Sequence, residues 1–266
     1  MPFAKPSWFG VIHSHFVLCT VLGLIVLDAS RDGLRELLKA EGGPNLLDVA
    51  SGSLVSGIIV AGATWLIHRT WFRKLRERYR GRGDAHPDVA FRGATVGFVC
   101  GALSPLYIFV PYLMVILALV FLALIVAYFR TFIARAAIVL RPGNYPRPPD
   151  ILSLVFLYGA IIACFTVLNA ALVGIHKVFG VHAEAFQGFP EGAVHFIDTF
   201  YFTVVVMTTL GFGDITPVTA DAKLVVAFEV VIAYLMFALL IGTITRGILP
   251  HESAGETPQE DPPESR

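Results

Sequence analysis

Long apolar runs are the feature of this sequence that most restricts its fold. Of the 266 residues, 56% are hydrophobic and 15% are charged, whereas soluble domains average about 45–50% apolar and about 25% charged residues. Within a bilayer every backbone amide and carbonyl must find its partner inside the protein, which leaves helices and closed barrels as spanning structures. The runs approach the roughly 20 residues that a helix needs to cross the hydrocarbon core. We therefore expect an all-α integral membrane protein.

The apolar runs predict six membrane-spanning helices. The stretch from residue 93 to residue 129 is too long for one ordinary span, and Pro105 and Pro111 interrupt it, so we divide it into two spans that turn near Pro111. The expected spans cover residues 8–27, 46–68, 93–109, 112–129, 151–175 and 223–246. Small residues at every fourth position of one span favour close contact with another helix. They are Gly93, Gly97 and Gly101.

The chain divides into two membrane domains and a tail. Residues 130–150 contain several prolines, which break helices, so we interpret this stretch as a linker and place the domain boundary at its end. The first domain, residues 1–150, holds four spans. The second, residues 151–250, holds two spans. Residues 251–266 are rich in proline, glutamate and serine and are expected to be disordered.

A seven-residue segment between the last two spans contains two glycines that flank a single residue. Its sequence is Thr208-Thr209-Leu210-Gly211-Phe212-Gly213-Asp214. Glycine tolerates left-handed backbone angles, so Gly211 and Gly213 allow right- and left-handed residues to alternate. Such alternation turns successive carbonyl oxygens the same way, and a column of these oxygens can replace the water shell of a bare cation. Thr209 can add its hydroxyl oxygen at the inner mouth.

The run from Phe196 to Phe202, continued through Gly213-Asp214-Ile215-Thr216-Pro217, resembles the pore signature of the potassium channel superfamily. It is most similar to bacterial channels with one pore repeat in each chain, and the resemblance covers roughly the last 100 residues. The implied function is passive conduction of K⁺ across the plasma membrane. The implied assembly is a homotetramer, because each chain supplies one strand of the filter.

The resemblance also assigns roles to individual residues. Potassium ions would bind the carbonyls of Thr209, Leu210, Gly211 and Phe212 and the Thr209 hydroxyl. The residues from about 195 to 207 would form a re-entrant pore helix, with Asp198 in its first turn at the positive end of the helix dipole. The residues expected to support the filter are Thr208, Gly213, Asp214, Tyr201 and Asp198.

Two positions depart from the commonest family pattern. Phe212 replaces a tyrosine, and the missing hydroxyl would weaken the bracing of the filter against the pore helix. Val205 stands where some relatives have a glutamate behind the filter, so Asp214 cannot pair with an acid there.

The last span carries a single acid, Glu229. An ionisable group inside a membrane is costly and indicates function. It would either meet water in the central cavity or bond to a pore-helix group from behind, and we favour the bond. Ala233 occupies the position where relatives often have a hinge glycine, and Gly242 is the nearest glycine at which the helix could bend. The loop from His176 to Val194 is expected to be solvated.

Basic residues set the expected orientation. They concentrate in residues 69–92 and 130–150, which places these segments and both termini in the cytoplasm. The cluster from Arg69 to Arg82 is interpreted mainly as this topology signal, with anionic lipid as a possible partner. The span 112–129 contains no basic residue, and Arg130, Arg135 and Arg141 follow at spacings that fall on different helix faces. We therefore expect gating without a voltage sensor.

Several classes of function are excluded by the sequence. Zero net charge gives no reason to expect a nucleic acid partner, and no nucleotide loop, metal cluster or nucleophile constellation indicates an enzyme or a cofactor other than the permeant K⁺. The three cysteines lie in apolar runs and are expected to be buried thiols. Two alternatives stay open: a potassium transporter, although those resemble chains with four degenerate repeats, and a non-conducting regulatory channel subunit.

Overall fold

The computed structural model describes residues 8–29, 46–67, 69–70, 87–103, 111–142, 146, 148–180, 184–189 and 196–248. Three expected features fall largely or wholly outside these ranges. They are most of the basic cluster at 69–82, the turn just before Pro111, and the tail at 251–266.

The described residues are mostly helical, as expected for this class of sequence. The helices are α1 (Trp8–Ala29), α3 (Leu46–Ile67), α5 (Pro87–Leu103), α7 (Pro111–Val139), α8 (Pro148–Val178), α9 (Phe196–Met207) and α10 (Ala220–Ile248). Two short strands, β1 (Phe186–Gln187) and β2 (Thr216–Pro217), form an antiparallel pair that an all-α prediction misses. Within the described ranges, α3, α7, α8 and α10 are long and apolar enough to cross a membrane.

The expected linker is shorter than the sequence analysis supposed. Helix α7 continues through Arg130 and ends at Val139, and Phe132 and Ala136 on this extension are buried. The reason is that the helix-breaking prolines begin only at Pro142, while the preceding residues are compatible with a helix. Helix α8 then starts at Pro148, since proline is favoured in the first turn.

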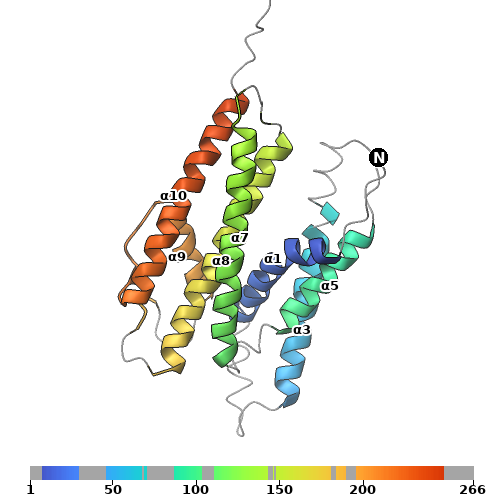
Figure 1. The fold of residues 1–266 in the computed structure, drawn as a ribbon. Coiled ribbons are helices and arrows are strands. Elements are labelled where there is room, and N and C mark those ends of the chain that lie inside the picture. The colour runs from blue at the N-terminus through green and yellow to red at the C-terminus, as the bar shows by residue number, and fades with distance from the viewer. Residues whose placement is uncertain are drawn as a thin grey trace, which may run out of the picture.

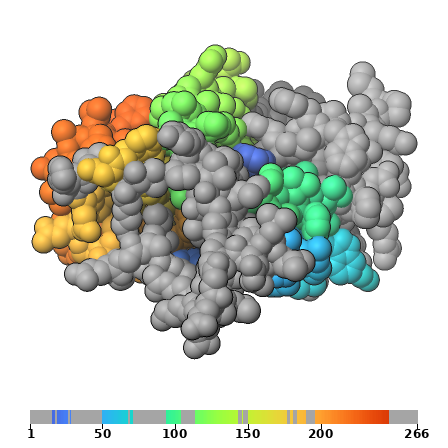
Figure 2. Space-filling view, turned by 90° about the horizontal axis from the view of Figure 1, so that it is seen from below, coloured from blue at the N-terminus to red at the C-terminus, as the bar shows by residue number. Residues whose placement is uncertain are grey.

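Helices α7, α8 and α10 are long rods that run side by side, and the short α9 lies between α8 and α10 (Figure 1). Helices α3 and α5 form a separate pair, and α1 lies between this pair and the longer helices. Figure 2 agrees, with the orange and yellow surfaces of α10 and α8 on one side and the cyan and blue-green surfaces of α3 and α5 on the other.

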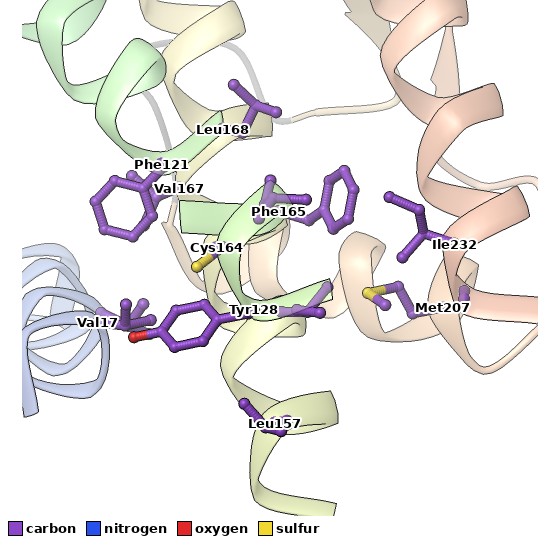
Figure 3. Packing of buried hydrophobic residues seen from close by; sticks show 14 of the residues in the cluster. Val17, Phe121, Tyr128, Leu157, Cys164, Phe165, Val167, Leu168, Met207 and Ile232 are labelled. Carbon is purple, nitrogen blue, oxygen red and sulfur yellow. The ribbon is translucent and has the colours of Figure 1, made fainter. Parts of the chain in front are cut away.

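The largest hydrophobic core joins residues from both sides of position 150. Val17 of α1 and Phe121 of α7 belong to the same buried cluster as Phe165 of α8, Met207 of α9 and Ile232 of α10. In Figure 3, Phe165 lies between Phe121 on one side and Ile232 on the other. The boundary placed at residue 150 is therefore crossed by continuous packing.

The pair α3–α5 packs through small residues, which confirms the role expected for two of the three spaced glycines. A Cβ atom added at Gly101 would lie 2.8 Å from the Ser56 carbonyl oxygen, and one at Gly97 would lie 2.9 Å from Thr64 Oγ1. Only glycine permits the two backbones to approach this closely. The three cysteines are free and buried, as expected, and Cys19 and Cys100 line the contact of α1 with the pair.

Candidate functional site

The glycine-containing segment 208–214 follows directly after α9 and has an alternating backbone. Positive φ angles occur at Thr209 (60°), Gly211 (56°) and Gly213 (79°), whereas Leu210 and Phe212 between them have the ordinary sign. This is the alternation that aligns successive carbonyl groups. The sequence indicates it at the two glycines but not at Thr209, whose left-handed conformation costs about 1–3 kcal/mol.

Hydrogen bonds to α9 hold the first half of the segment. The amide of Thr208 donates to the Val204 carbonyl at 2.9 Å, and the Thr208 hydroxyl donates to the same oxygen at 2.6 Å. The amides of Leu210 and Gly211 both donate to the Val205 carbonyl, at 3.0 and 3.4 Å. Val205 thus anchors the segment through its backbone, although its side chain offers no acid.

The C-terminal end of the segment is braced from α9. The Tyr201 side chain makes a hydrogen bond with the Asp214 carboxylate. Neither Phe212 nor Val205 can provide such a bond, so Tyr201 supplies a brace that these two residues do not. Asp198 lies in the first turn of α9, as the sequence suggests.

The strand pair also supports the C-terminal end of the segment. Phe186 pairs with Pro217, and Gln187 pairs with Thr216. Gly188 follows β1 with a φ of 97°, and a Cβ atom there would overlap the Asp214 carbonyl oxygen. This contact fixes the backbone just after the glycine-containing segment. Sequence analysis assigned residues 186–189 to a solvated loop, and no strong local signal marks them.

An aromatic cluster lies behind this support. The rings of Phe186 and Phe202 are 5.2 Å apart and nearly perpendicular, and Phe189 lies 5.6 Å from Phe186 and 6.4 Å from Phe202. Ile215 and Ala222 complete the buried part of the cluster. Edge-to-face aromatic pairs contribute about 0.5–1.5 kcal/mol beyond their buried area. The cluster therefore ties the loop, α9 and the start of α10 into one rigid layer.

The C-terminal end of α9 is held by α8. The hydroxyl of Tyr158 donates to the Met207 carbonyl at 2.6 Å, and the Met207 side chain is fully buried. This bond satisfies a carbonyl in the last turn of α9, where helical partners are missing. No role was expected for Tyr158 from sequence alone.

Glu229 is fully buried and is linked to α9 through a third helix. The amide nitrogen of Asn169 on α8 donates to Glu229 Oε2 at 3.0 Å and to Thr203 Oγ1 at 3.2 Å. Glu229 Oε1 and Asn169 Oδ1 have no hydrogen-bond partner. Glu229 therefore lies in contact with protein, and its link to α9 runs through Asn169.

The other two positions considered for gating differ in their surroundings. Ala233 is fully buried in the main core. Gly242 is partly exposed, a Cβ atom added there would meet no other part of the chain within 4 Å, and α10 runs through it as one continuous helix.

His176 is buried, contrary to the expectation of a solvated loop. It belongs to the end of α8, and its Nε2 lies 2.7 Å from Oδ2 of Asp221 in the first turn of α10. The extra helical turn of α8 carries His176 inward, which a boundary placed at residue 175 cannot reveal. This contact joins the two long helices at the end where the strand pair lies.

At the opposite ends of α8 and α10, basic side chains connect each of these helices to α7 or to the residue that follows it. The Arg246 guanidinium at the end of α10 donates to the Leu140 carbonyl that follows α7, and Arg135 of α7 donates to Ser153 of α8. Arginine near a helix C-terminus satisfies free carbonyls and complements the dipole. Within the basic cluster, Arg69 lies 4.8 Å above the Trp65 ring.

Comparison with known proteins adds two findings. Residues 151–248 match the family model described as "Ion channel". A stretch of 36 residues is 53% identical to a hyperpolarization-activated voltage-gated potassium channel of Methanocaldococcus jannaschii. This stretch is 14% of the present chain and 17% of that relative. No solved structure matches.

We predict that Gly188→Ala will disorder the segment 208–217, whereas Gly180→Ala will not. Both glycines have positive φ, so both substitutions add backbone strain, but a Cβ at Gly180 meets open space. The additional clash at Gly188 should lower the free energy of unfolding by about 1–3 kcal/mol more than the control. Hydrogen exchange of peptides from this segment, with unfolding titrations in micelles, measures both effects. Equal behaviour of the two variants would disprove the close contact with Asp214.

We also predict non-additive effects at the buried pair. Asn169→Leu removes the donor of Glu229 and should lower the free energy of unfolding by about 1–3 kcal/mol. Asn169→Leu combined with Glu229→Leu should recover part of this loss, because replacing both partners by apolar groups leaves no orphaned carboxyl. A double-mutant cycle measured by unfolding titration tests this coupling. Strictly additive losses would mean that the two residues are energetically independent.

Proposed function

The C-terminal part of the chain, residues 151–248, belongs to the potassium channel superfamily, and on that premise we propose that the protein is a potassium-selective channel. It conducts K⁺ passively across the plasma membrane through the filter Thr209-Leu210-Gly211-Phe212-Gly213. The observation that carries the proposal is the alternation of positive φ angles at residues 209, 211 and 213. No enzymatic reaction and no resident cofactor form part of the proposal.

In this proposal the filter works by exchanging water for carbonyl oxygens. The carbonyls of residues 209–212 and the Thr209 hydroxyl bind K⁺ in successive sites. Repulsion between ions in neighbouring sites weakens binding enough for the ions to leave. The C-terminal end of α9 carries the negative end of the helix dipole and favours a dehydrating cation in the cavity below. Thr208, Gly213, Asp214, Tyr201 and Asp198 keep this geometry rigid.

The proposed assembly is a homotetramer, because one chain contributes one wall of the filter. In the single chain, Leu210 is 60% exposed and Phe212 is 64% exposed, and a Cβ at Gly211 or Gly213 meets nothing within 4 Å. Apolar side chains of α10, among them Leu224, Val231 and Tyr234, are also exposed. Three further copies around the pore axis would cover part of these surfaces.

The proposed membrane arrangement has six spans and a re-entrant α9, with the filter near the outer surface and both termini in the cytoplasm. A four-span domain (1–150), a pore domain (151–250) and a cytoplasmic tail (251–266) follow from it. The contacts of Arg135 and Arg246 then lie at the cytoplasmic end, where positive charge is expected. Anionic lipid at the cluster from Arg69 to Arg82 is a further proposal of the same kind.

We propose that no voltage sensor drives gating. Each unit charge that crosses 100 mV contributes only about 2.3 kcal/mol, so steep gating needs several basic residues within one span. Helix α7 has none between Pro111 and Phe129, and Arg135 is bonded to Ser153. The name of the archaeal relative describes that protein, and the matched stretch covers a small part of it.

We predict K⁺ efflux, with far less Na⁺ efflux, from liposomes that contain the protein. Gly213→Ala should abolish K⁺-selective flux, because a Cβ resists the φ of 79° at this position. Gly62→Ala on α3, where the Cβ meets open space, is the matched control. A transporter would instead require a coupled gradient, and a non-conducting subunit would give no flux. Undiminished K⁺-selective flux in Gly213→Ala would refute the assignment of this segment as a filter.

We predict that open probability in planar bilayers will change little with voltage, because α7 carries no array of charges to move. Neutralising Arg130 and Arg135 together should leave the conductance–voltage relation unchanged, apart from any loss of protein stability. A steep relation that flattens in this double variant would refute the proposal on gating and leave the filter assignment intact.

A further inference from the structure

The last turn of α1 makes a direct hydrogen bond to the start of α9. Oδ2 of Asp28 accepts a hydrogen bond from the backbone amide of Ile197 at 3.1 Å, across 169 positions of the sequence. Asp28 is the second-last residue of α1, and Ile197 is the second residue of α9. This contact joins the N-terminal helices to the helix that carries the filter.

The position of the bond matches that of a helix N-cap. The first amides of a helix lack helical partners, and a cap side chain commonly accepts from the second or third of them. The five residues before α9 are Glu191-Gly192-Ala193-Val194-His195, and none of them is Ser, Thr, Asp or Asn. The sequence therefore supplies no strong local cap, and Asp28 provides the acceptor from another helix. A carboxylate is also the charge that a helix N-terminus favours.

Helix α1 is itself fixed on two sides. One side contributes Val17, Val21 and Leu24 to the main core, which also contains Phe196 and Met207 at the two ends of α9. The other side contributes Cys19 to the cluster with α3 and α5, and its sulfur lies 3.4 Å from Thr64 Oγ1. A displacement of the α3–α5 pair would therefore reach Asp28 through one rigid helix.

We propose that Asp28 is a positioning residue of the pore helix and that it couples the N-terminal helices to the filter. The carboxylate fixes the start of α9, while Tyr158 fixes its end, so the height and direction of the helix are set at both termini. The expected effect of Asp28 on K⁺ conduction rests on the proposed function. The contact itself does not depend on that function.

The structural test is hydrogen exchange of the first-turn peptide of α9 in lipid nanodiscs. Asp28→Ala should speed exchange about fivefold, as the typical loss of an N-cap does. Asp28→Asn, which keeps an acceptor, should show a smaller change and guards against misfolding of the alanine variant. Asp28→Ala combined with His195→Asp, which offers a local cap, should restore slow exchange. Glu184→Ala removes an exposed carboxylate of the loop near β1 and is the matched control.

The functional test uses the same variants in K⁺ and Na⁺ flux from liposomes. Asp28→Ala should reduce K⁺ flux or its selectivity several-fold, His195→Asp should restore it, and Glu184→Ala should behave as the parent protein. Exchange in Asp28→Ala equal to that of the parent would overturn the capping role. Faster exchange with unchanged flux would overturn the coupling to the filter. If the parent protein conducts nothing but Asp28→Ala still speeds exchange, the proposed function fails and the positioning role stands.

Discussion

The strained backbone at Thr209 is the constraint on which the rest of this site depends. A non-glycine residue with a φ of 60° persists only where its surroundings determine it fully. Here the neighbouring amides of Thr208 and Leu210 are bonded to carbonyls in the last turns of α9. The direction of α9 therefore decides whether the segment that follows can hold its alternating conformation. Every contact that fixes α9 contributes indirectly to the geometry of the segment 208–214.

These contacts come from each element around α9. Asp28 reaches its start from α1, Tyr158 reaches its end from α8, and Asn169 links Thr203 in its middle to Glu229 on α10. The contacts of Asn169 are buried and that of Tyr158 is partly buried, where an unmade hydrogen bond is costly, whereas the contact of Asp28 with Ile197 is exposed. Apolar packing supplies the remaining support through the Phe186–Phe189–Phe202 cluster and the main core.

The sequence was sufficient for features that depend on local chemistry. Apolar length predicted the long helices, Pro111 marked the start of α7, and the glycine spacing predicted close contact with another helix, which the structure identifies as α3. The positive φ angles at Gly211 and Gly213 agree with the expected alternation, whereas the roles of these residues in ion binding stay proposals. The helical extension from Arg130 to Val139 was missed because proline content was counted over the whole stretch instead of by position.

Features that join distant parts of the chain could not be read from the sequence. Asp28 and Ile197 are far apart in sequence, and so are Gly188 and Asp214, so no local pattern pairs them. His176 was placed in solvent because the helix end was drawn at residue 175, three residues before α8 ends at Val178, which shows how a small boundary error changes the environment of a side chain. Asn169 was overlooked because a lone amide in an apolar run gives no signal until its partner is known.

The continuous core across residue 150 has a consequence for evolution and for protein engineering. The segment that sequence comparison recognises, residues 151–248, is a unit of descent but not a unit of packing, since Phe165 and Leu154 are buried in a core shared with α7 and α1. This segment grafted alone into another protein would present these side chains to lipid or to a foreign helix. Matching residues of α1 and α7 would therefore have to accompany it in any stable chimera, and natural variation at these contacts should be correlated across residue 150.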